Sequence, residues 1–301
     1  FAKYRIDGAA EPLAALKQQM TEYAQWTRAQ VLPKSRSDTR LPPELYAFQL
    51  KQVGIDIDPQ QLMQRAQLEF METRSVMRQL APLVAREKGL PVMEARWTRY
   101  LPHMVRGREI IESGTLGEVR ALFADHTQRL PQDPGHRINA MSLGGGALLD
   151  LGIYPVSFAW DVLGEPVTVQ AAARLGETGA DAEVATVMTH ASGALSTTIS
   201  SSRAAGANTA HVVGTEARID IDRVWYTPTS FTVTAPDGTV LERYESHVEG
   251  RGMQYQAIAA EGFVAEGLLE GRELPLDESL AIMGTLDEIR AQIGLTYPGE
   301  S

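Results

Sequence analysis

Polar and apolar residues at the start of the chain alternate with the period of an α-helix, because apolar positions recur at intervals of three and four. Residues 11–32, EPLAALKQQMTEYAQWTRAQVL, show this spacing and predict a helix. Residues 41–54 begin near two prolines and stop at a glycine, which predicts a second, short helix. A third helix is predicted over residues 58–80, with Asp58 as its N-cap. The opening of the chain is therefore predicted to be all-helical.

The pattern changes after residue 100. Helices are predicted over 102–114 and 146–163, with a strand over 118–130 between them. A series of short β-rich segments follows, with a proline-aspartate-glycine turn at 236–238 that predicts a hairpin. The predicted strands of this series cover residues 166–175, 183–190, 194–202, 209–214, 217–222, 230–235 and 239–245.

Two helices are predicted to close the chain, over 252–271 and 277–294, and Asp277 is the expected N-cap of the second. Consecutive strands between helices predict an α+β fold. We expect an N-terminal all-helical segment, followed by an α/β domain with a large mixed or antiparallel sheet. This sheet is expected to be open on one face and flanked by helices. We expect no complete Rossmann domain.

Composition divides the chain near residue 88. Up to Leu90 there are 13 Lys and Arg against 10 Asp and Glu, whereas the remainder holds 15 against 28. Three of the 26 glycines fall before residue 90, and all five lysines fall within the first 88 residues. Such shifts indicate a domain boundary. We therefore predict a helical segment over 1–88 and a second domain over 89–301.

Charge and residue usage exclude several classes of protein. The net charge of −10 argues against a nucleic-acid-binding protein, because phosphate backbones require a basic surface. The absence of cysteine excludes disulfides and thiolate metal sites. No apolar run approaches the roughly 20 residues that span a bilayer, and no signal peptide is visible. We expect no membrane partner and a cytoplasmic location.

The segment LGGGALLDLGIYPVSFAWD, residues 143–161, carries the first candidate chemistry. Asp150 and Tyr154 are four residues apart and share one face of the predicted helix. A phenol can exchange a proton with a substrate hydroxyl, and a neighbouring carboxylate can orient the substrate or the phenol. Taken alone, the pair is equally consistent with a helix N-terminal acid and a core aromatic residue.

Several motifs occur in order over residues 83–301, and together they resemble the C-terminal domain of the Gfo/Idh/MocA family of NAD(P)-dependent oxidoreductases. The variants WTR and GIYP are similar to the branch of dihydrodiol and xylose dehydrogenases. The matching segments are MEARWTRYLPHM (93–104), GTLGEVR (114–120), LGGGALLDLGIYPVSF (143–158), ETGADAE (177–183), GRGMQYQA (250–257) and DEIRAQIGLTYP (287–298).

The resemblance implies a dehydrogenase that acts on the CH–OH group of a sugar or diol, with NAD(P) as cofactor. It also implies that Tyr154 and Asp150 are catalytic and that the sheet face, over residues 167–244, forms a homodimer. The residues that the resemblance places at the substrate are Trp97, Arg99, Arg120 and Arg174. A buried indole, a surface ion pair and solvated strand charges are the structural alternatives for these four.

Residues 1–85 resemble a helical stretch of a bacterial peptidase-like family of unknown function that carries a zinc motif of the H-E-x-x-H type. All six histidines lie after residue 100 and none forms this motif, so we expect no metal site. The chain therefore resembles a chimera, in which a piece of this bacterial family is joined to the C-terminal half of the dehydrogenase family, and we expect a bacterial protein.

Two parts of the dehydrogenase machinery are missing from the sequence. There is no G-x-G-x-x-G motif, which a Rossmann domain uses to approach the pyrophosphate. The family's Glu-Lys-Pro lysine also has no counterpart, because Gly89 follows Lys88 where proline is expected. We therefore expect the chain to be inactive alone. The alternatives are a non-catalytic dimerisation or assembly module and a peptidase-like helical protein without its metal site.

Overall fold

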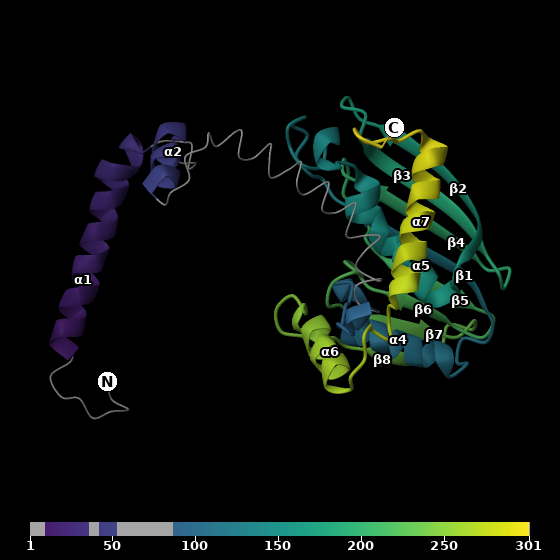
Figure 1. Cartoon of the computed structure of the whole chain (residues 1–301). Coiled ribbons are helices and arrows are strands. Elements are labelled where there is room, and N and C mark those ends of the chain that lie inside the picture. Colours follow the sequence, from purple (N-terminus) through teal and green to yellow (C-terminus); the bar gives the residue numbers. More distant parts are fainter. Residues whose placement is uncertain (1–9, 36–41, 53–86, 301) are drawn as a thin grey trace. The chain divides into compact units, whose positions relative to one another are not determined.

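A computed structural model describes residues 10–35, 42–52 and 87–300 (Figure 1). The chain divides into two compact units, Phe1–Glu69 and Phe70–Ser301, which we describe separately. The third predicted helix, with its N-cap Asp58, lies outside the described residues. The predicted domain boundary at residue 88 also adjoins residues outside the described ranges, so it stays a prediction.

The first unit confirms the first two predicted helices. Helix α1 covers Ala10–Trp26 and α2 covers Pro43–Gln52. A π-helical turn, Thr27–Val31, and a 3₁₀ turn, Leu32–Lys34, extend α1. The apolar side chains that set the helical pattern are exposed in this unit, and two of its aromatic rings stack with centroids 5.9 Å apart. The exposed large apolar side chains of α1 are Leu16, Met20, Tyr23 and Trp26.

The second unit is built on an eight-stranded sheet with the order β2-β3-β4-β1-β5-β6-β7-β8. Strands β1 and β4 pair in parallel, and every other neighbouring pair is antiparallel. The predicted mixed, largely antiparallel sheet is thus confirmed. The strands are β1 Val119–Thr127, β2 Pro166–Leu175, β3 Asp181–His190, β4 Leu195–Ser201, β5 Ala210–Gly214, β6 Arg218–Ile221, β7 Phe231–Thr234 and β8 Val240–Tyr244.

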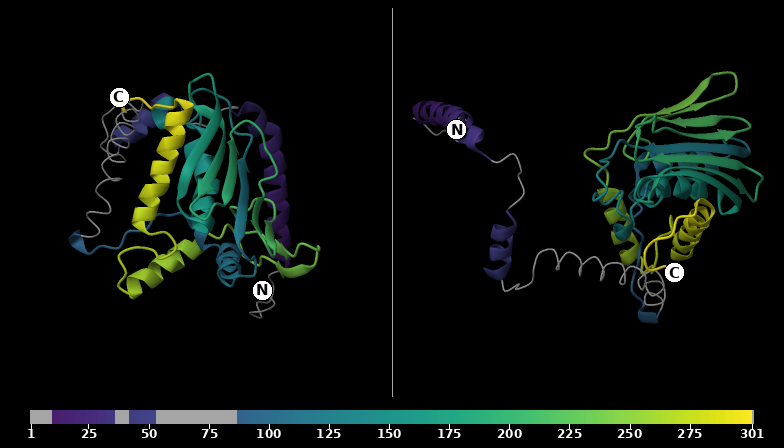
Figure 2. Two further views of the ribbon diagram at one scale, coloured as in Figure 1. Left: turned by 90° about the vertical axis from the view of Figure 1, so that its right-hand side faces the viewer. Right: turned by 90° about the horizontal axis from the view of Figure 1, so that it is seen from above.

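Helices cover one face of this sheet. Figure 2 shows α5 and α7 along the same face, and no element of residues 87–300 covers the opposite one. The side chains of β3 follow this division, because Val184 and Met188 are buried whereas Ala185 and Val187 are exposed. The helices and short turns of this unit are Trp97–Tyr100 (a 3₁₀ turn), α4 Pro102–Glu112, Met141–Leu143 (a 3₁₀ turn), Leu148–Gly152 (a π-helical turn), α5 Ile153–Leu163, α6 Gln254–Ala265 and α7 Leu276–Ile293.

Helix α5 forms the centre of the core. Its side chains pack against α4, the inner face of the sheet and the fully buried Trp225. Among the described residues, Met141–Leu163 is the one stretch long and apolar enough to cross a membrane. The expectation that no segment reaches this length was therefore wrong. However, 67% of its most apolar window is buried inside the folded domain, as in a core helix.

The expected N-cap of α7 was also wrong. The helix begins at Leu276, and Pro275 occupies the N-cap position without a side-chain cap. Asp277 lies in the first turn, where its negative charge still favours the helix dipole. The first backbone N–H group of the helix has a partner outside the helix, because Leu276 N donates to Glu270 Oε2 at 2.8 Å. A contact from outside the helix has thus replaced the local cap.

The three glycines before α5 allow the backbone to approach β3 closely. Gly144 and Gly146 adopt positive φ angles of 67° and 141°. A β-carbon at Gly146 would lie 2.0 Å from Asp181 Oδ1, at the start of β3. The other carboxylate oxygen, Oδ2, accepts a hydrogen bond from Leu148 N at 2.6 Å. This turn therefore docks the π-helical turn Leu148–Gly152, which leads into α5, onto the sheet.

We expect Gly146→Ala to destabilise the protein by more than about 2 kcal/mol, because the new methyl group needs both a disfavoured φ and the space of Asp181. Gly107→Ala is the matched control. Gly107 lies within α4 and a β-carbon there meets no atom within 4 Å, so the same change is expected to stabilise by roughly 0.5–1 kcal/mol. Urea denaturation measures both; equal effects would contradict this account of the turn.

Candidate functional site

Four elements bring aromatic and polar side chains together beside the first turn of α5. Tyr154 comes from α5, and His126 comes from the C-terminal end of β1. Trp97 lies in the 3₁₀ turn before α4, and Tyr226 lies in the connection between β6 and β7. These residues are far apart in the sequence, so their cluster is a product of the tertiary fold.

Tyr154 is half-buried and is held by contacts on three sides. Trp97 Nε1 donates a hydrogen bond to the phenol oxygen of Tyr154 at 3.2 Å. The His126 ring meets the Tyr154 ring edge-on, with centroids 4.9 Å apart and planes at 83°. The Tyr226 ring lies 5.7 Å away at a tilt of 56°. The phenol is therefore fixed in position while part of its surface stays open.

His126 is neutral and has a fixed tautomer in this cluster. Gln128 Nε2 lies 2.9 Å from His126 Nε2, so the amide donates and Nε2 accepts. The ring proton is then on Nδ1, which donates to Leu151 O at 3.2 Å. Burial lowers the pKa of His126 to about 4, and the ring stacks on Tyr226 with centroids 3.7 Å apart. The site therefore contains no imidazolium charge at neutral pH.

Asp150 lies one turn before Tyr154, in the π-helical turn that precedes α5. Its carboxylate is engaged by Arg137 in a two-pronged contact, with distances of 2.8 Å from Nη1 to Oδ1 and 3.3 Å from Nη2 to Oδ2. Both side chains are partly exposed, so this pair adds little stability. Its main effect is to orient the carboxylate and to neutralise its charge.

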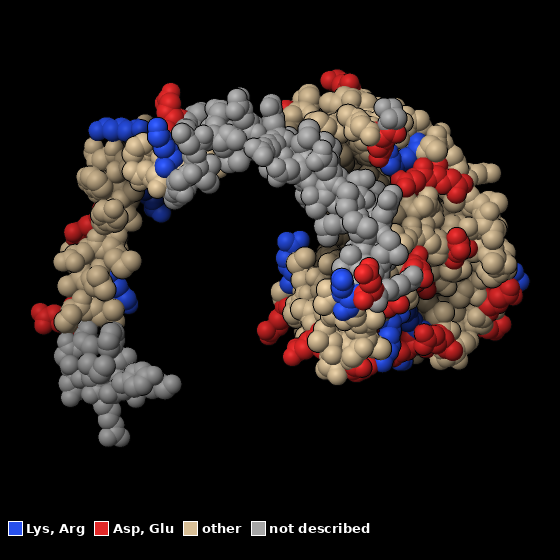
Figure 3. Space-filling model, viewed as in Figure 1, with Lys and Arg blue, Asp and Glu red and all other residues tan. Residues whose placement is uncertain are grey.

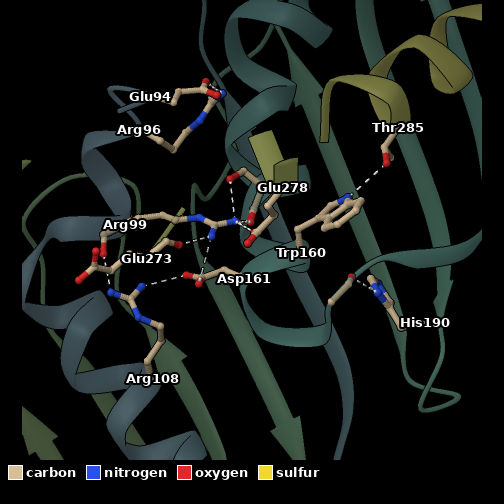
Figure 4. Close-up of polar contacts among 12 residues, drawn as sticks. Glu94, Arg96, Arg99, Arg108, Trp160, Asp161, His190, Glu273, Glu278 and Thr285 are labelled. Atoms are coloured by element: carbon tan, nitrogen blue, oxygen red, sulfur yellow. Dashed lines mark hydrogen bonds and ion pairs between the residues drawn. The ribbon is translucent and has the colours of Figure 1, made fainter. Parts of the chain in front are cut away.

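Arg99 is buried, and its guanidinium is engaged inside the protein (Figure 4). Nη2 donates to Ser157 O at 3.0 Å and lies 2.7 Å from Glu278 Oε1. Nη1 donates to Glu273 O at 2.6 Å and lies 3.6 Å from Asp161 Oδ1. These partners come from α5, α7 and the segment before α7. The predicted substrate contact of Arg99 stays a prediction.

Arg120 and Arg174 are exposed on the sheet and pair with neighbouring carboxylates, Glu118 at 2.9 Å and Glu183 at 3.6 Å. Arg120 lies near the start of β1, six residues and thus roughly 20 Å along the strand from His126. Arg174 lies on β2, three strands from β1 in the sheet order. The structure does not bring either arginine to Tyr154 within this subunit, and their roles stay predictions.

Sequence reasoning missed most of the groups around the phenol. In the sequence His126 resembles an ordinary strand residue with an accessible face, and Tyr226 lies in an irregular connection without a pattern. Gln128 and Arg137 lie in the long connection between β1 and α5. The useful signal was the position of His126 at the end of a strand, where polar inward-facing side chains often line sites.

Among the described residues, no lysine contacts the Tyr154 phenol, and no cluster of metal-ligating side chains occurs. Lys88 Nζ lies 3.6 Å from Glu87, and both side chains are exposed. Within residues 10–35, 42–52 and 87–300, no contact joins a lysine to Tyr154. No group of three or more metal-ligating side chains occurs in these ranges either. The described cluster therefore consists of neutral donors and aromatic rings around one phenol.

Comparison with known proteins identifies the family to which this chain belongs. The profile of the GFO/IDH/MocA C-terminal domain matches residues 104–220. Trans-1,2-dihydrobenzene-1,2-diol dehydrogenase of Mus musculus is 34% identical over 220 residues, which cover 71% of this chain and 65% of that protein. The chain belongs to the Gfo/Idh/MocA family of oxidoreductases. The predicted family resemblance is confirmed.

Two further proteins are similar to this chain. D-xylose 1-dehydrogenase (NADP(+)) of Hypocrea jecorina is 29% identical over 287 residues, covering 85% of this chain and 72% of that protein. The crystal structure of a 3-ketoreductase from Actinomadura kijaniata with NADP and TDP-benzene matches with a TM-score of 0.62 at 23% identity, over 72% of this chain and 66% of that one. The latter supports the fold alone.

The resemblance of the opening residues is also confirmed. The profile of a bacterial protein family of unknown function, DUF885, matches residues 2–140. It overlaps the Gfo/Idh/MocA match over residues 104–140, so the two matches do not set a boundary at residue 88. The chain spans 65% of the length of its mouse relative.

Asp181 controls the start of the helix that carries Asp150 and Tyr154. It is buried, and burial raises its pKa from 3.8 to about 6, although the Leu148 N–H opposes this rise. A carboxyl group whose pKa is higher in the folded state contributes stability below the unfolded pKa. That contribution is lost as the pH rises through about 6. This helix is therefore held more firmly in mild acid.

We expect Asp181→Asn to gain stability relative to the natural protein as the pH rises from 4 to 7, by about 3 kcal/mol, since asparagine does not ionise. Asp237→Asn is the control of opposite sign. The Thr239 N–H lowers the pKa of the exposed Asp237 from 3.8, so this variant should lose stability relative to the natural protein as the pH rises toward about 4, and should change little above that pH. Urea melts from about pH 3 to 7 measure both, and parallel curves for Asp181→Asn would refute the assignment.

Proposed function

We propose that this protein carries the substrate site of an NAD(P)-dependent dehydrogenase that acts on the CH–OH group of a sugar or a cyclic diol. The observation that carries the proposal is the Tyr154 phenol, which the protein holds through a donor while part of the ring stays open. The names of the relatives support this substrate class, since they are a dihydrodiol dehydrogenase and a D-xylose dehydrogenase.

Tyr154 is the proposed acid/base. In the oxidising direction the substrate hydroxyl loses its proton as the carbinol carbon loses hydride, and in the reducing direction the phenol returns a proton to the carbonyl oxygen. NAD(P), when bound, accepts or supplies the hydride. Asp150, oriented by Arg137, would bind a second substrate hydroxyl.

The electrostatics of the site favour a neutral substrate. His126 carries no charge at neutral pH, and Arg137 neutralises Asp150. On the face of the second unit seen in Figure 3, acidic and basic side chains are intermingled rather than gathered into a basic surface. A phosphorylated sugar would need a concentrated positive charge. A neutral polyol ring against Trp97 and Tyr226 fits these groups better.

The glycine turn before α5 does not fit a dinucleotide. Its close approach is filled by the Asp181 carboxylate, which already accepts the Leu148 N–H at the start of the helix. A pyrophosphate at this place would meet a carboxylate instead of free N–H donors. We therefore assign no part of a cofactor cradle to this turn and propose that the chain alone does not turn over.

The full chain is expected to bind a neutral cyclic trans-diol or D-xylose, and Tyr154→Phe should weaken this binding about fivefold, the effect of one hydrogen bond. Chemical-shift titration measures the affinity, and Tyr46→Phe in α2 is the control that should leave it unchanged. NADP⁺ added to the same sample is expected to stay oxidised. Unchanged affinity in Tyr154→Phe, or steady NADPH formation, would contradict the proposal.

A second function, assembly into a homodimer, is supported by the open face of the sheet. Phe123, Val187 and Ile199 point to this face and remain 45–47% exposed. The ladder places them on the adjacent strands β1, β3 and β4, since Phe123 and Val187 both neighbour Thr197. An exposed apolar patch of this kind is typical of an interface. We propose a cytoplasmic homodimer that pairs through this face, in a bacterial chain formed by fusion of pieces of two families.

We expect Phe123→Arg to convert a dimer into a monomer, because a desolvated charge would be placed at the centre of the proposed interface. Ile258→Arg is the control, since Ile258 is 59% exposed on α6, away from the strands. Light scattering over a range of protein concentrations reports the mass. A natural protein that stays monomeric at high concentration would refute the proposed dimer.

A further inference from the structure

The turn Trp97–Tyr100 contacts the site through three consecutive side chains. Trp97 Nε1 donates to the Tyr154 phenol oxygen at 3.2 Å. Thr98 Oγ1 donates to Tyr226 O at 2.9 Å. Arg99 Nη2 donates to Ser157 O at 3.0 Å, one turn after Tyr154 in α5. Each residue of the turn thus reaches a different component of the aromatic cluster.

We propose that Trp97, Thr98 and Arg99 form a positioning clamp that fixes the phenol of Tyr154 and directs its proton toward the substrate. The inference rests on the proposed function only in taking Tyr154 as the acid/base. Trp97 itself is a positioning residue, because it acts through the phenol. This assignment differs from a general role in lining the substrate pocket.

The indole of Trp97 determines the direction in which the phenol proton of Tyr154 points. An indole N–H is a donor and has no acceptor lone pair, so Trp97 can only donate to the phenol oxygen. The phenol proton must then point away from Trp97. The His126 ring meets the Tyr154 ring edge-on, and the Tyr226 ring is tilted against it. The clamp therefore directs the O–H group away from the indole, toward the side on which we propose that the substrate binds.

Arg99 prevents the turn from moving relative to α5. Besides Ser157 O, its buried guanidinium contacts Asp161, which is also buried, and Glu278, which is partly exposed (Figure 4). Arg108 Nη2 donates to Arg99 O at 2.7 Å, and its Nη1 contacts Asp161 at 3.0 Å. Both the backbone and the side chain of Arg99 are held. A buried charge with these partners cannot shift without losing them, so Trp97 is held at a fixed distance from α5.

A small cavity separates the clamp from the helix. Arg96, Thr98, Arg99, Tyr154 and Ser157 are among its lining residues, and its volume of about 10 Å³ is close to the minimum for one water molecule. The clamp therefore packs on α5 with little free space.

The indole N–H resonances test the clamp directly, because the chain has four tryptophans. In ¹⁵N-labelled full chain, Tyr154→Phe should shift the Trp97 resonance and speed its hydrogen exchange about fivefold, the loss of one hydrogen bond. Two internal controls should not move: Trp160, which donates to Thr285 Oγ1, and Trp225, which donates to Asp125 O. Trp97→Phe assigns the resonance, and an unmoved Trp97 signal would overturn the proposal.

A second pair of variants tests the role of Arg99. Arg99→Lys keeps the charge but loses the planar set of donors, so it should speed Trp97 exchange about fivefold with Tyr154 intact. Asp161→Asn has the same shape and gives a second variant if Arg99→Lys does not fold. Unchanged Trp97 exchange in the folded variants would overturn the clamp while leaving the Trp97–Tyr154 bond.

Diol affinity separates this inference from the proposed function. If the clamp directs the phenol proton, Trp97→Phe should weaken diol binding about as much as Tyr154→Phe does. If the natural chain does not bind diols but the Trp97 resonance responds to Tyr154→Phe, the proposed function fails and the bond stands. If diols bind equally well to Trp97→Phe and the natural chain, the clamp fails and the proposed function stands.

Discussion

The buried guanidinium of Arg99 is the interaction on which the site depends. A charge taken out of water must be met by several partners, and a single missing partner is costly. The partners of the Arg99 guanidinium are Ser157 and Asp161 on α5, Glu278 on α7, and Glu273 O in the segment before α7. These partners come from separate segments, so the same contacts that neutralise Arg99 also fix α5 against α7 and the preceding turn.

Helix α5 is consequently fixed along its length. At its start, the glycine turn allows Asp181 to reach Leu148 N. Further along, Arg99 and Arg108 hold Asp161. Tyr154 lies between these two attachments and projects its phenol to Trp97. A phenol on a helix that is attached on both sides keeps a fixed geometry, which the proposed proton transfer would require.

The aromatic cluster shows which features local sequence patterns predict and which depend on the tertiary fold. The strand pattern of VRALFADHT predicted β1 correctly, but His126 was interpreted as an ordinary strand residue with an accessible face, whereas the structure buries it. The pattern did not predict that Tyr226, one hundred residues later, would stack on that ring. The same division applies to α7: local preference favoured Asp277 as the cap, yet Glu270, six residues before the helix, reaches its first N–H. Long-range contacts overrode a local preference in both cases.

The sequence by itself determined most helices and strands of the second unit, the mixed sheet and the family, because periodicity and short motifs are local properties. It suggested that Asp150 and Tyr154 act as a pair. Only the tertiary structure decided that Arg137 engages Asp150, that Arg99 is held inside the protein and that Trp97 donates to Tyr154. These contacts join side chains from segments that are distant in the sequence, and such contacts leave no periodic signal in it.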